Sequence, residues 1–197
     1  MVAKLSAKKA ALVGLVGAAA LVCGTTLALA QEAKVVELPK AQTTGGKPLM
    51  ECLRDRKTSR SFSNKALPPQ TLSNLLWAAF GVNRPDGKRT APSAVNWQEV
   101  EVYVATADGM YLYDAQAQTL KLVVAKDLRT ATGGQPFVPV APVNLVFVAD
   151  YAKMGRAGDA DKDRYSAADT GFISENVYLY CASEGLATET LKQLTQF

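Results

Sequence analysis

Apolar residues at helical spacing mark two segments in the first half of the chain. In residues 70–80 they recur at i, i+3, i+4 and i+7, the stripe of a helix that packs along one side. This stripe consists of Leu72, Leu75, Leu76 and Ala79. Gly81 stands where a C-terminal cap belongs. A shorter helix is predicted over residues 48–56. Its apolar side is made of Leu49, Cys52 and Leu53.

Alternating and continuous apolar runs predict strands in the middle of the chain. Residues 99–106 alternate, and one face of this strand is made of Val100, Val102 and Val104. Asp108-Gly109 is a turn signal, so residues 110–114 are expected to return as the second strand of a hairpin. Residues 119–125 predict a third strand. Residues 143–150, VNLVFVAD, are almost continuously apolar, which indicates a central strand covered on both faces.

The last third of the chain has a second helical pattern. Apolar side chains step by three or four from residue 160 to residue 186. Residues 177–182 are apolar on nearly every side, so this half of the helix is expected to be buried. Gly185 breaks the pattern, and the amphipathic residues 186–197 are predicted to be helical. This order of elements predicts an α+β domain with a mostly antiparallel central sheet flanked by helices.

The first thirty residues have the pattern of an export signal. Three lysines, Lys4, Lys8 and Lys9, precede the apolar residues 10–22. Ala28-Leu29-Ala30 then forms a small-residue cleavage site before Gln31. This pattern predicts a Sec-type signal peptide over residues 1–30. The mature protein is therefore expected in the periplasm or outside the cell.

Two other interpretations of this segment are weaker. An uncleaved membrane anchor needs ~20 apolar residues, more than the run provides. A lipoprotein modified at Cys23 would have the branched Val22 directly before the modified residue. After cleavage no membrane span is expected. Residues 31–47 are predicted to be an extended segment, and residues 48–197 to form one domain.

The composition excludes several classes of function. The net charge is +4, and three of these charges are lysines of the predicted signal peptide, so no electrostatic footprint for nucleic acid remains. Histidine is absent, which excludes imidazole bases and histidine metal sites, and no CxxC pair offers a zinc site. No metal site is expected, and chemistry needs carboxylates or a bound cofactor. Cys52 and Cys181 would form either a disulfide or two buried thiols.

A first candidate site is a cluster of cations after the first predicted helix. Residues 54–60 hold four cations and the hydroxyl of Thr58. Forked guanidinium donors, a lysine and a hydroxyl suit a phosphate monoester. Cations are also stabilised at the C-terminal end of a helix, and the spacing alone favours that interpretation.

A second candidate is RTAPSAVNWQ, residues 89–98, directly before the first predicted hairpin strand. Ser93 offers a hydroxyl, and Asn96 offers a donor and an acceptor, which suits the edge of a heterocyclic ring. Proline, serine and asparagine are also common turn residues, so a turn leading into a strand is the alternative.

A third candidate is SEGLAT, residues 183–188, at the end of the long helix. Gly185 would let the backbone approach a ligand closely, and Glu184 beside it is an acceptor. A glycine that stops the helix is the structural alternative.

Taken together, these stretches resemble the nitroreductase superfamily of FMN-dependent oxidoreductases. The similarity is greatest to its SagB-type (thiazoline/oxazoline dehydrogenase-like) branch. Residues 56–60, RKTSR, stand in place of the family's Arg-Arg-Ser-x-Arg, and LLWAAFGVNR (75–84) matches the branch. Residues 92–96 match the family's Pro-Ser-x-x-Asn. The hairpin DGMYLYD, the strand APVNLVFVAD and the helix that runs to Glu184-Gly185-Leu186 are also similar. The resemblance covers roughly residues 48–192.

The resemblance implies a role for each matched residue. The phosphate and ribityl chain of FMN would be held by Arg56, Lys57, Thr58 and Arg60. The isoalloxazine ring would be contacted by Pro92, Ser93 and Asn96. Its N5 and O4 edge would lie near Glu184, Gly185 and Leu186. The three stretches are therefore expected to converge on one FMN.

The resemblance also implies an activity and an assembly. The activity is hydride transfer through flavin N5 to or from an unidentified small molecule, in a nitroreductase-like fold that forms a homodimer. Family members continue further beyond the last helix, so the chain is expected to be short at its C-terminal end. A catalytically silent module that binds flavin or another small ligand is the alternative.

Overall fold

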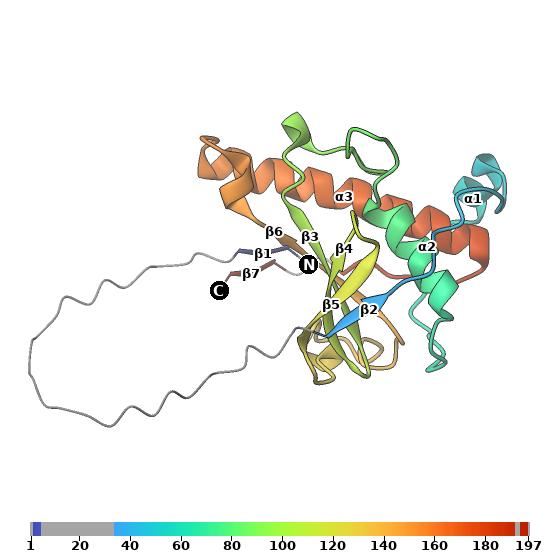
Figure 1. Cartoon of the computed structure of the whole chain (residues 1–197). Coiled ribbons are helices and arrows are strands. Elements are labelled where there is room, and N and C mark those ends of the chain that lie inside the picture. The colour runs from blue at the N-terminus through green and yellow to red at the C-terminus, as the bar shows by residue number, and fades with distance from the viewer. Residues whose placement is uncertain (1, 5–33, 192–193, 197) are drawn as a thin grey trace, which may run out of the picture.

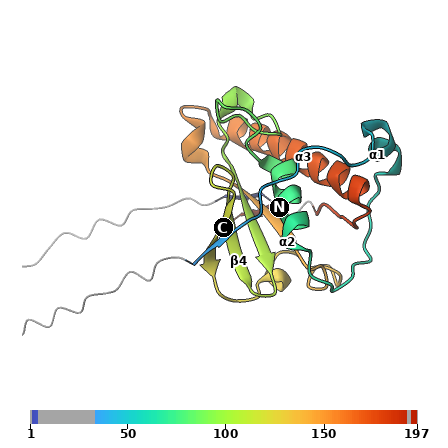
Figure 2. The same ribbon diagram turned by 45° about the vertical axis from the view of Figure 1, so that its right-hand side comes forward.

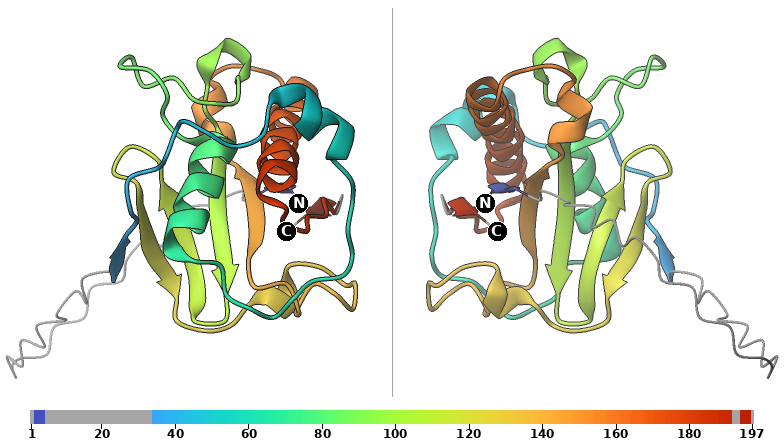
Figure 3. Two further views of the ribbon diagram at one scale, coloured as in Figure 1. Left: turned by 90° about the vertical axis from the view of Figure 1, so that its right-hand side faces the viewer. Right: turned by 90° about the vertical axis from the view of Figure 1, so that its left-hand side faces the viewer.

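A seven-stranded sheet forms one layer of the molecule, and the helices lie against one of its faces (Figures 1 and 3). The computed structural model describes residues 2–4, 34–191 and 194–196. The strands follow the order β2-β5-β4-β3-β6-β1-β7. The strand bounds are β1 Val2–Lys4, β2 Val35–Glu37, β3 Val100–Thr106, β4 Gly109–Asp114, β5 Thr119–Val124, β6 Asn144–Ala149 and β7 Leu194–Gln196. The α-helices are α1 Leu49–Asp55, α2 Pro69–Phe80 and α3 Asp159–Glu184.

The neighbouring strands from β2 to β6 pair antiparallel, which confirms the predicted α+β architecture. The predicted hairpin of β3 and β4 is present, with Thr106 opposite Gly109. The predicted inner face of β3 is buried, since Val100, Val102 and Val104 are at most 4% exposed. The sequence did not indicate β2, which lies in the predicted extended segment and pairs with β5 at the edge of the sheet.

The prediction that β6 is covered on both faces holds only in part, because α2 and α3 lie on the same side of the sheet (Figure 3). The inward side chain of Phe147 packs with Leu76 of α2 and Ile173 of α3 in the main core. On the opposite face of β6, Val146 is buried and Val148 is half-buried. The continuous apolar run correctly predicted a strand. It did not predict how many layers of helices cover the strand, because that depends on the tertiary structure.

Gly81 ends α2 as predicted, but its backbone is not in the left-handed conformation that is common at helix C-termini. Its backbone is extended, with φ −73° and ψ 161°, and its N–H donates to the carbonyl of Trp77. A Cβ at this position would lie 2.7 Å from the Cα of Trp77. Glycine is therefore required because the backbone folds back tightly over the last turn of the helix.

The burial of α3 differs from the prediction. Its buried side chains include the polar Ser166, Asp169 and Thr170 in the first half, whereas residues 177–180 are only half-buried. The second half of α3 has α1 beside it, and α1 leaves much of its own apolar surface in solvent (Figures 1 and 2). Leu49 is 62% exposed, so the predicted apolar side of α1 is not packed as a core.

The predicted helix over residues 186–197 is absent from residues 186–191, which have no regular secondary structure, and residues 194–196 form β7. The backbone of this segment is engaged by distant parts of the chain. The N–H of Ser59 donates to the carbonyl of Thr188 at 2.9 Å, and the N–H of Thr190 donates to the hydroxyl of Tyr178 at 3.0 Å. These contacts replace the local bonds that a helix would make.

The predicted signal peptide lies largely outside the described residues. Its residues 2–4 form β1, which pairs in parallel with β6 and β7. Cleavage after Ala30 would remove this strand, and the signal peptide stays a prediction. Within the ranges that the structure describes, no helix combines the length and apolarity that a membrane crossing requires. Cys52 and Cys181 are both buried free thiols.

Candidate functional site

The cationic segment, residues 56–60, lies along the C-terminal half of α3 and is positioned by Tyr178. The Arg56 guanidinium carbon is 5.3 Å from the centroid of the Tyr178 ring, a cation–π distance. The hydroxyl of Thr58 is 3.1 Å from the hydroxyl of Tyr178. One aromatic side chain therefore orders two predicted phosphate-binding residues. The sequence analysis missed Tyr178, because a half-buried tyrosine in a helical stripe carries no distinguishing signal.

A polar cavity of about 370 Å³ opens between α1, the cationic segment and the turn after α3. It is lined by Lys47, Asp55, Lys57, Ser59, Tyr178, Cys181, Ala182, Gly185, Leu186, Ala187 and Thr188. We call it the cationic cavity.

The ammonium of Lys47 crosses this cavity, lying 3.2 Å from the carbonyl oxygen of Ala182 and 3.4 Å from the Asp55 carboxylate. A hydrogen bond from Arg54 is the main cause that lowers the pKa of Asp55, so this carboxylate stays ionised and is paired. Lys57 makes no hydrogen bond or ion pair within the described residues. Its donors are free for an anionic ligand.

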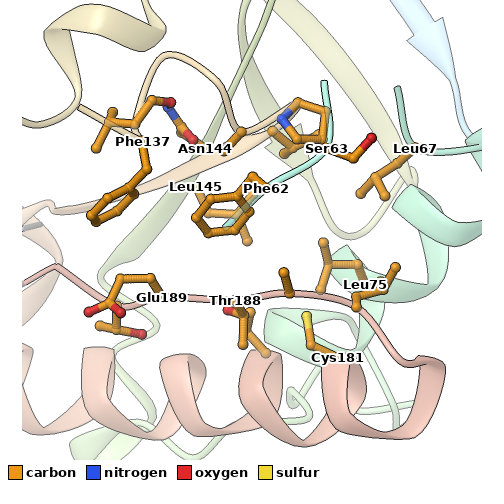
Figure 4. Close-up of a pocket in the computed structure, with 18 of the residues that line it drawn as sticks. Phe62, Ser63, Leu67, Leu75, Phe137, Asn144, Leu145, Cys181, Thr188 and Glu189 are labelled. Atoms are coloured by element: carbon orange, nitrogen blue, oxygen red, sulfur yellow. The ribbon is translucent and has the colours of Figure 1, made fainter. Parts of the chain in front are cut away.

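A larger, mostly apolar cavity of about 610 Å³ lies on the other side of residues 185–188, between α3, β6 and the segment after the cations (Figure 4). We call it the apolar cavity. The rings of Phe62 and Phe137 face it with centroids 5.9 Å apart. Its volume is within the range of small-molecule sites.

Glu189 is the buried carboxylate of this cavity, and the sequence analysis did not select it. Its side chain is 9% exposed, and Oε2 lies 3.5 Å from Nε of Arg60. Arg60 is thus directed to Glu189 and away from the cationic cavity, which it does not line. Burial raises the pKa of the Cys181 thiol to about 12, so Cys181 is a poor nucleophile at neutral pH.

At the end of α3, the structure supports the helix-stop interpretation of Gly185 and leaves the binding interpretation open. Gly185 has φ 70° and is the left-handed cap, and the N–H of Leu186 donates to the carbonyl of Cys181 at 2.8 Å. Gly185 and Leu186 line both cavities. Glu184 is exposed and lines neither, and its carboxylate accepts a 3.4 Å hydrogen bond from Ser183.

Residues 92–98, which belong to the second predicted stretch (89–98), pack against the N-terminal half of α3. The N–H of Ala94 donates to Asp169 at 2.9 Å, and the Trp97 ring meets the Tyr165 ring edge-on at 5.8 Å. The hydroxyl of Ser93 donates to Glu99 at 3.1 Å, so this hydroxyl has a partner within the chain.

Asn96 and Pro92 are exposed on this stretch. The side-chain oxygen of Asn96 accepts a hydrogen bond from Gln98 at 3.1 Å, which leaves its amide donors available.

The three predicted stretches do not converge within one copy of the chain. Asp169, which holds the 92–98 stretch, and Tyr178, which holds the cations, are nine residues apart on α3. At about 100° per residue these two side chains point to opposite sides of the helix. Gly185 lies roughly 24 Å along the helix from Asp169, at about 1.5 Å per residue. Lys57 and residues 185–186 line the cationic cavity, with Arg56 and Thr58 held beside it by Tyr178, and Pro92, Ser93 and Asn96 lie apart from them.

Comparison with known proteins assigns the chain to a family. Residues 53–196 match the model of the nitroreductase family. A protein of Methanocaldococcus jannaschii named as a nitroreductase is 31% identical over 150 residues, which is 71% of this chain and 76% of that protein. A nitroreductase structure from Ralstonia eutropha JMP134 is 46% identical with a TM-score of 0.75, over 80% of this chain and 75% of that one. An NADPH:FMN oxidoreductase structure from Vibrio harveyi has the same fold, with 19% identity, a TM-score of 0.51, and coverage of 71% of this chain and 53% of that one.

The chain belongs to the nitroreductase family. By class it is an FMN-dependent oxidoreductase with a nitroreductase fold. The finer similarity to the SagB-type branch stays a prediction.

Proposed function

We propose that this protein binds FMN at the cationic cavity and transfers hydride between the flavin and a small molecule. The observation that carries the proposal is the donor set around that cavity. Lys47 and Lys57 line it, and Tyr178 holds Arg56 and Thr58 beside it. Ammonium, guanidinium and hydroxyl donors fit the phosphate of FMN. The backbone of residues 185–188 would face the flavin ring.

The ring edge would be completed by residues 92–98 of a second copy. Within one chain this stretch lies on the opposite side of α3 from the cations, so it cannot reach the same ligand. A homodimer would bring it there. Exposed apolar side chains on α1 and α3 support such an assembly, since burial of apolar surface drives association. They are Leu49, Met50, Leu53 and Phe172, which are 47–75% exposed.

The bound flavin would supply the redox chemistry, because its N5 accepts and donates hydride. The chain's own residues would bind and orient it. The cations fix the phosphate end, the turn after α3 supports one face of the ring, and Asn96 of the second copy meets its edge. No histidine is present to act as a base.

We also propose that the protein acts after export. The lysines, apolar run and A-x-A site of residues 1–30 support a Sec-type signal peptide and a periplasmic or secreted location. An exported enzyme does not meet the cytoplasmic nicotinamide pools. Its electron donor would then be a different reductant.

The direct test is the visible absorption spectrum of the purified protein, with the released flavin identified after denaturation. The expected result is FMN in the isolated protein, or uptake of added FMN with micromolar or better affinity. Folded protein that takes up no FMN would remove the proposal. Dithionite-reduced holoprotein should then pass electrons to a nitroaromatic, a quinone or oxygen. Failure with all three acceptors favours the catalytically silent alternative.

The shared site can be tested by mixing two defective variants. One chain carries Arg56→Ala and Lys57→Ala, and the other carries Asn96→Ala. If each site combines the cations of one copy with the 92–98 stretch of the other, a mixed dimer has one intact site and regains flavin binding. If the site lies within one copy, no mixture regains it. The unmixed variants are the controls.

A further inference from the structure

Residues 92–98 adopt a backbone that this sequence does not favour by itself. Val95, Asn96 and Gln98 have φ of 52°, 58° and 48°. The left-handed region is unfavourable for residues with a side chain, and most of all for a β-branched one such as Val95. Val95 is 82% exposed, so its own packing does not hold it there. A structure that keeps such a conformation must fix it through other contacts.

Two buried carboxyl groups provide these contacts. Glu99 is fully buried, and Asp169 is 3% exposed. Asp169 accepts the N–H of Ala94 at 2.9 Å. Glu99 accepts the hydroxyl of Ser93 at 3.1 Å, and the same hydroxyl oxygen accepts the N–H of Gln98 at 2.8 Å. The two acids thus hold the stretch at both ends.

The two carboxyl groups are within hydrogen-bonding reach of each other, and no cation acts on Glu99 within the described residues. Two buried carboxylates without a counter-ion repel each other, which favours the protonated form of one of them. Burial, and then the negative charge of Asp169, raise the pKa of Glu99. Its Oε1 receives no hydrogen bond in the described residues, so this oxygen is free to carry the proton and to donate it to the Asp169 carboxylate.

Other charged groups near this site have different partners. Arg89 reaches the stretch at the side-chain oxygen of Gln98. The N–H of Asp150 donates to the main-chain carbonyl of Glu99, and its side chain accepts the N–H of Ala152. Lys153 pairs with Glu101. Asp169 is therefore the charged side chain that controls Glu99.

We propose that Glu99 and Asp169 share one proton, and that this neutralised pair is the device that holds residues 92–98 in the conformation that presents Asn96. Glu99 is then a positioning residue, which acts through Ser93 and Asp169. When the shared proton is lost, the two charges repel and the stretch is released. The conformation of residues 92–98, which we assign to the edge of the flavin ring, therefore depends on pH.

The test is amide hydrogen exchange of residues 94, 96, 97 and 98 between pH 5 and 9, without added flavin. In the wild type, protection factors of these amides should fall with rising pH, by up to about tenfold per pH unit between the ordinary carboxyl pKa of about 4.5 and the raised pKa of Glu99, and should level off above it. Glu99→Gln keeps the shape without the charge, so its protection should stay constant. Equal pH dependence in the wild type and Glu99→Gln would overturn the proposal.

Two further variants sharpen the result. Glu101→Gln lies on the same strand, and its carboxylate pairs with Lys153 outside this cluster, so it should behave as the wild type. Asp169→Asn removes the repulsion and should weaken the pH dependence. If Glu99→Gln does not fold, the infrared band of a buried protonated carboxyl, followed in the wild type from pH 5 to pH 9, decides the matter. Absence of that band overturns the proposal.

The inference itself needs no flavin, and its functional consequence rests on the proposed function. FMN affinity of the wild type should fall over the same pH range, and that of Glu99→Gln should not. If the protein shows the expected pH dependence of amide exchange but does not bind FMN, the role of Glu99 is confirmed and the proposed function is wrong. The two failures are therefore distinguishable.

Discussion

The two sides of α3 hold their neighbouring segments in different ways. On one side, buried Asp169 and Glu99 fix residues 92–98 through hydrogen bonds whose partners are all within the chain. On the other side, Tyr178 orders an exposed cationic segment, and Lys57 is left with free donors. Buried polar groups must be paired, so they determine backbone conformation. Exposed cations gain little from local pairing, and they remain available to a ligand.

The comparison predicts its largest stability effect at Asp169. Asp169→Ala leaves the half-buried N–H of Ala94 without its acceptor, and the free energy of unfolding should fall by about 1–3 kcal/mol. Urea denaturation measures this change. Glu175→Ala, at an exposed position of the same helix, is the control and should stay within about 0.5 kcal/mol of the wild type. Equal losses of stability in Asp169→Ala and Glu175→Ala would show that the buried carboxylate contributes no more than an exposed one.

On the cationic side the effect should appear in binding and not in stability. The double variant Arg56→Ala and Lys57→Ala should weaken FMN binding by about 1.5–3 kcal/mol, because charge-assisted hydrogen bonds to the phosphate are lost. Fluorescence titration with FMN measures the affinity. Arg54→Ala is the matched control, since Arg54 pairs with Asp55 and does not line the cationic cavity. If affinity instead responds to Phe62→Ala, the flavin lies in the apolar cavity.

The dependence of stability on pH separates the two sides further. The pKa of Glu99 is raised above its ordinary value of about 4.5, so its stabilising contribution is complete below that pH and is lost as pH rises through the folded-state pKa. Relative to Glu99→Gln, the wild type should lose at most about 1.4 kcal/mol per pH unit over that window. Urea denaturation at several pH values tests this. If the wild type instead became more stable than Glu99→Gln as the pH rises over this range, the pKa of Glu99 would be lowered in the folded state and not raised.

The smallest effect is expected from relief of backbone strain. Val95→Gly should raise the free energy of unfolding by about 0.5–1 kcal/mol, because glycine adopts positive φ without the steric penalty of a branched residue. Val123→Gly is the control at an exposed strand position, where glycine should destabilise. Thermal denaturation compares the two. A loss of stability in Val95→Gly would mean that Val95 makes contacts which outweigh its strain.

Local sequence patterns predicted much of the fold. The stripe of Leu75, Leu76 and Ala79 became the buried side of α2, and the alternation of Val100, Val102 and Val104 became the inner face of β3. The predicted long helix agrees with α3 to within two residues at each end. Residues 186–191 were predicted as helix and have no regular secondary structure, because their backbone bonds with Ser59, far away in the sequence, and with the side chain of Tyr178.

The candidate site was predictable only in part. The cations and the glycine turn were selected from residue type, and the structure places Lys57 and Gly185 at the cationic cavity and directs Arg60 to Glu189. Tyr178, Glu99 and Glu189 were not selected, because their roles come from burial and from partners that no local pattern reveals. Convergence of all three stretches in one chain was expected, and the geometry of α3 separates them.

By itself, the sequence determined most of the secondary structure, the family, and the classes of residue available for chemistry, since these depend on composition and on spacing over a few residues. Only the tertiary structure decided which carboxylates are buried, which cations stay free, and which side of α3 each segment occupies. These properties depend on contacts between residues far apart in the chain, where desolvation and pairing set the energy of each charge.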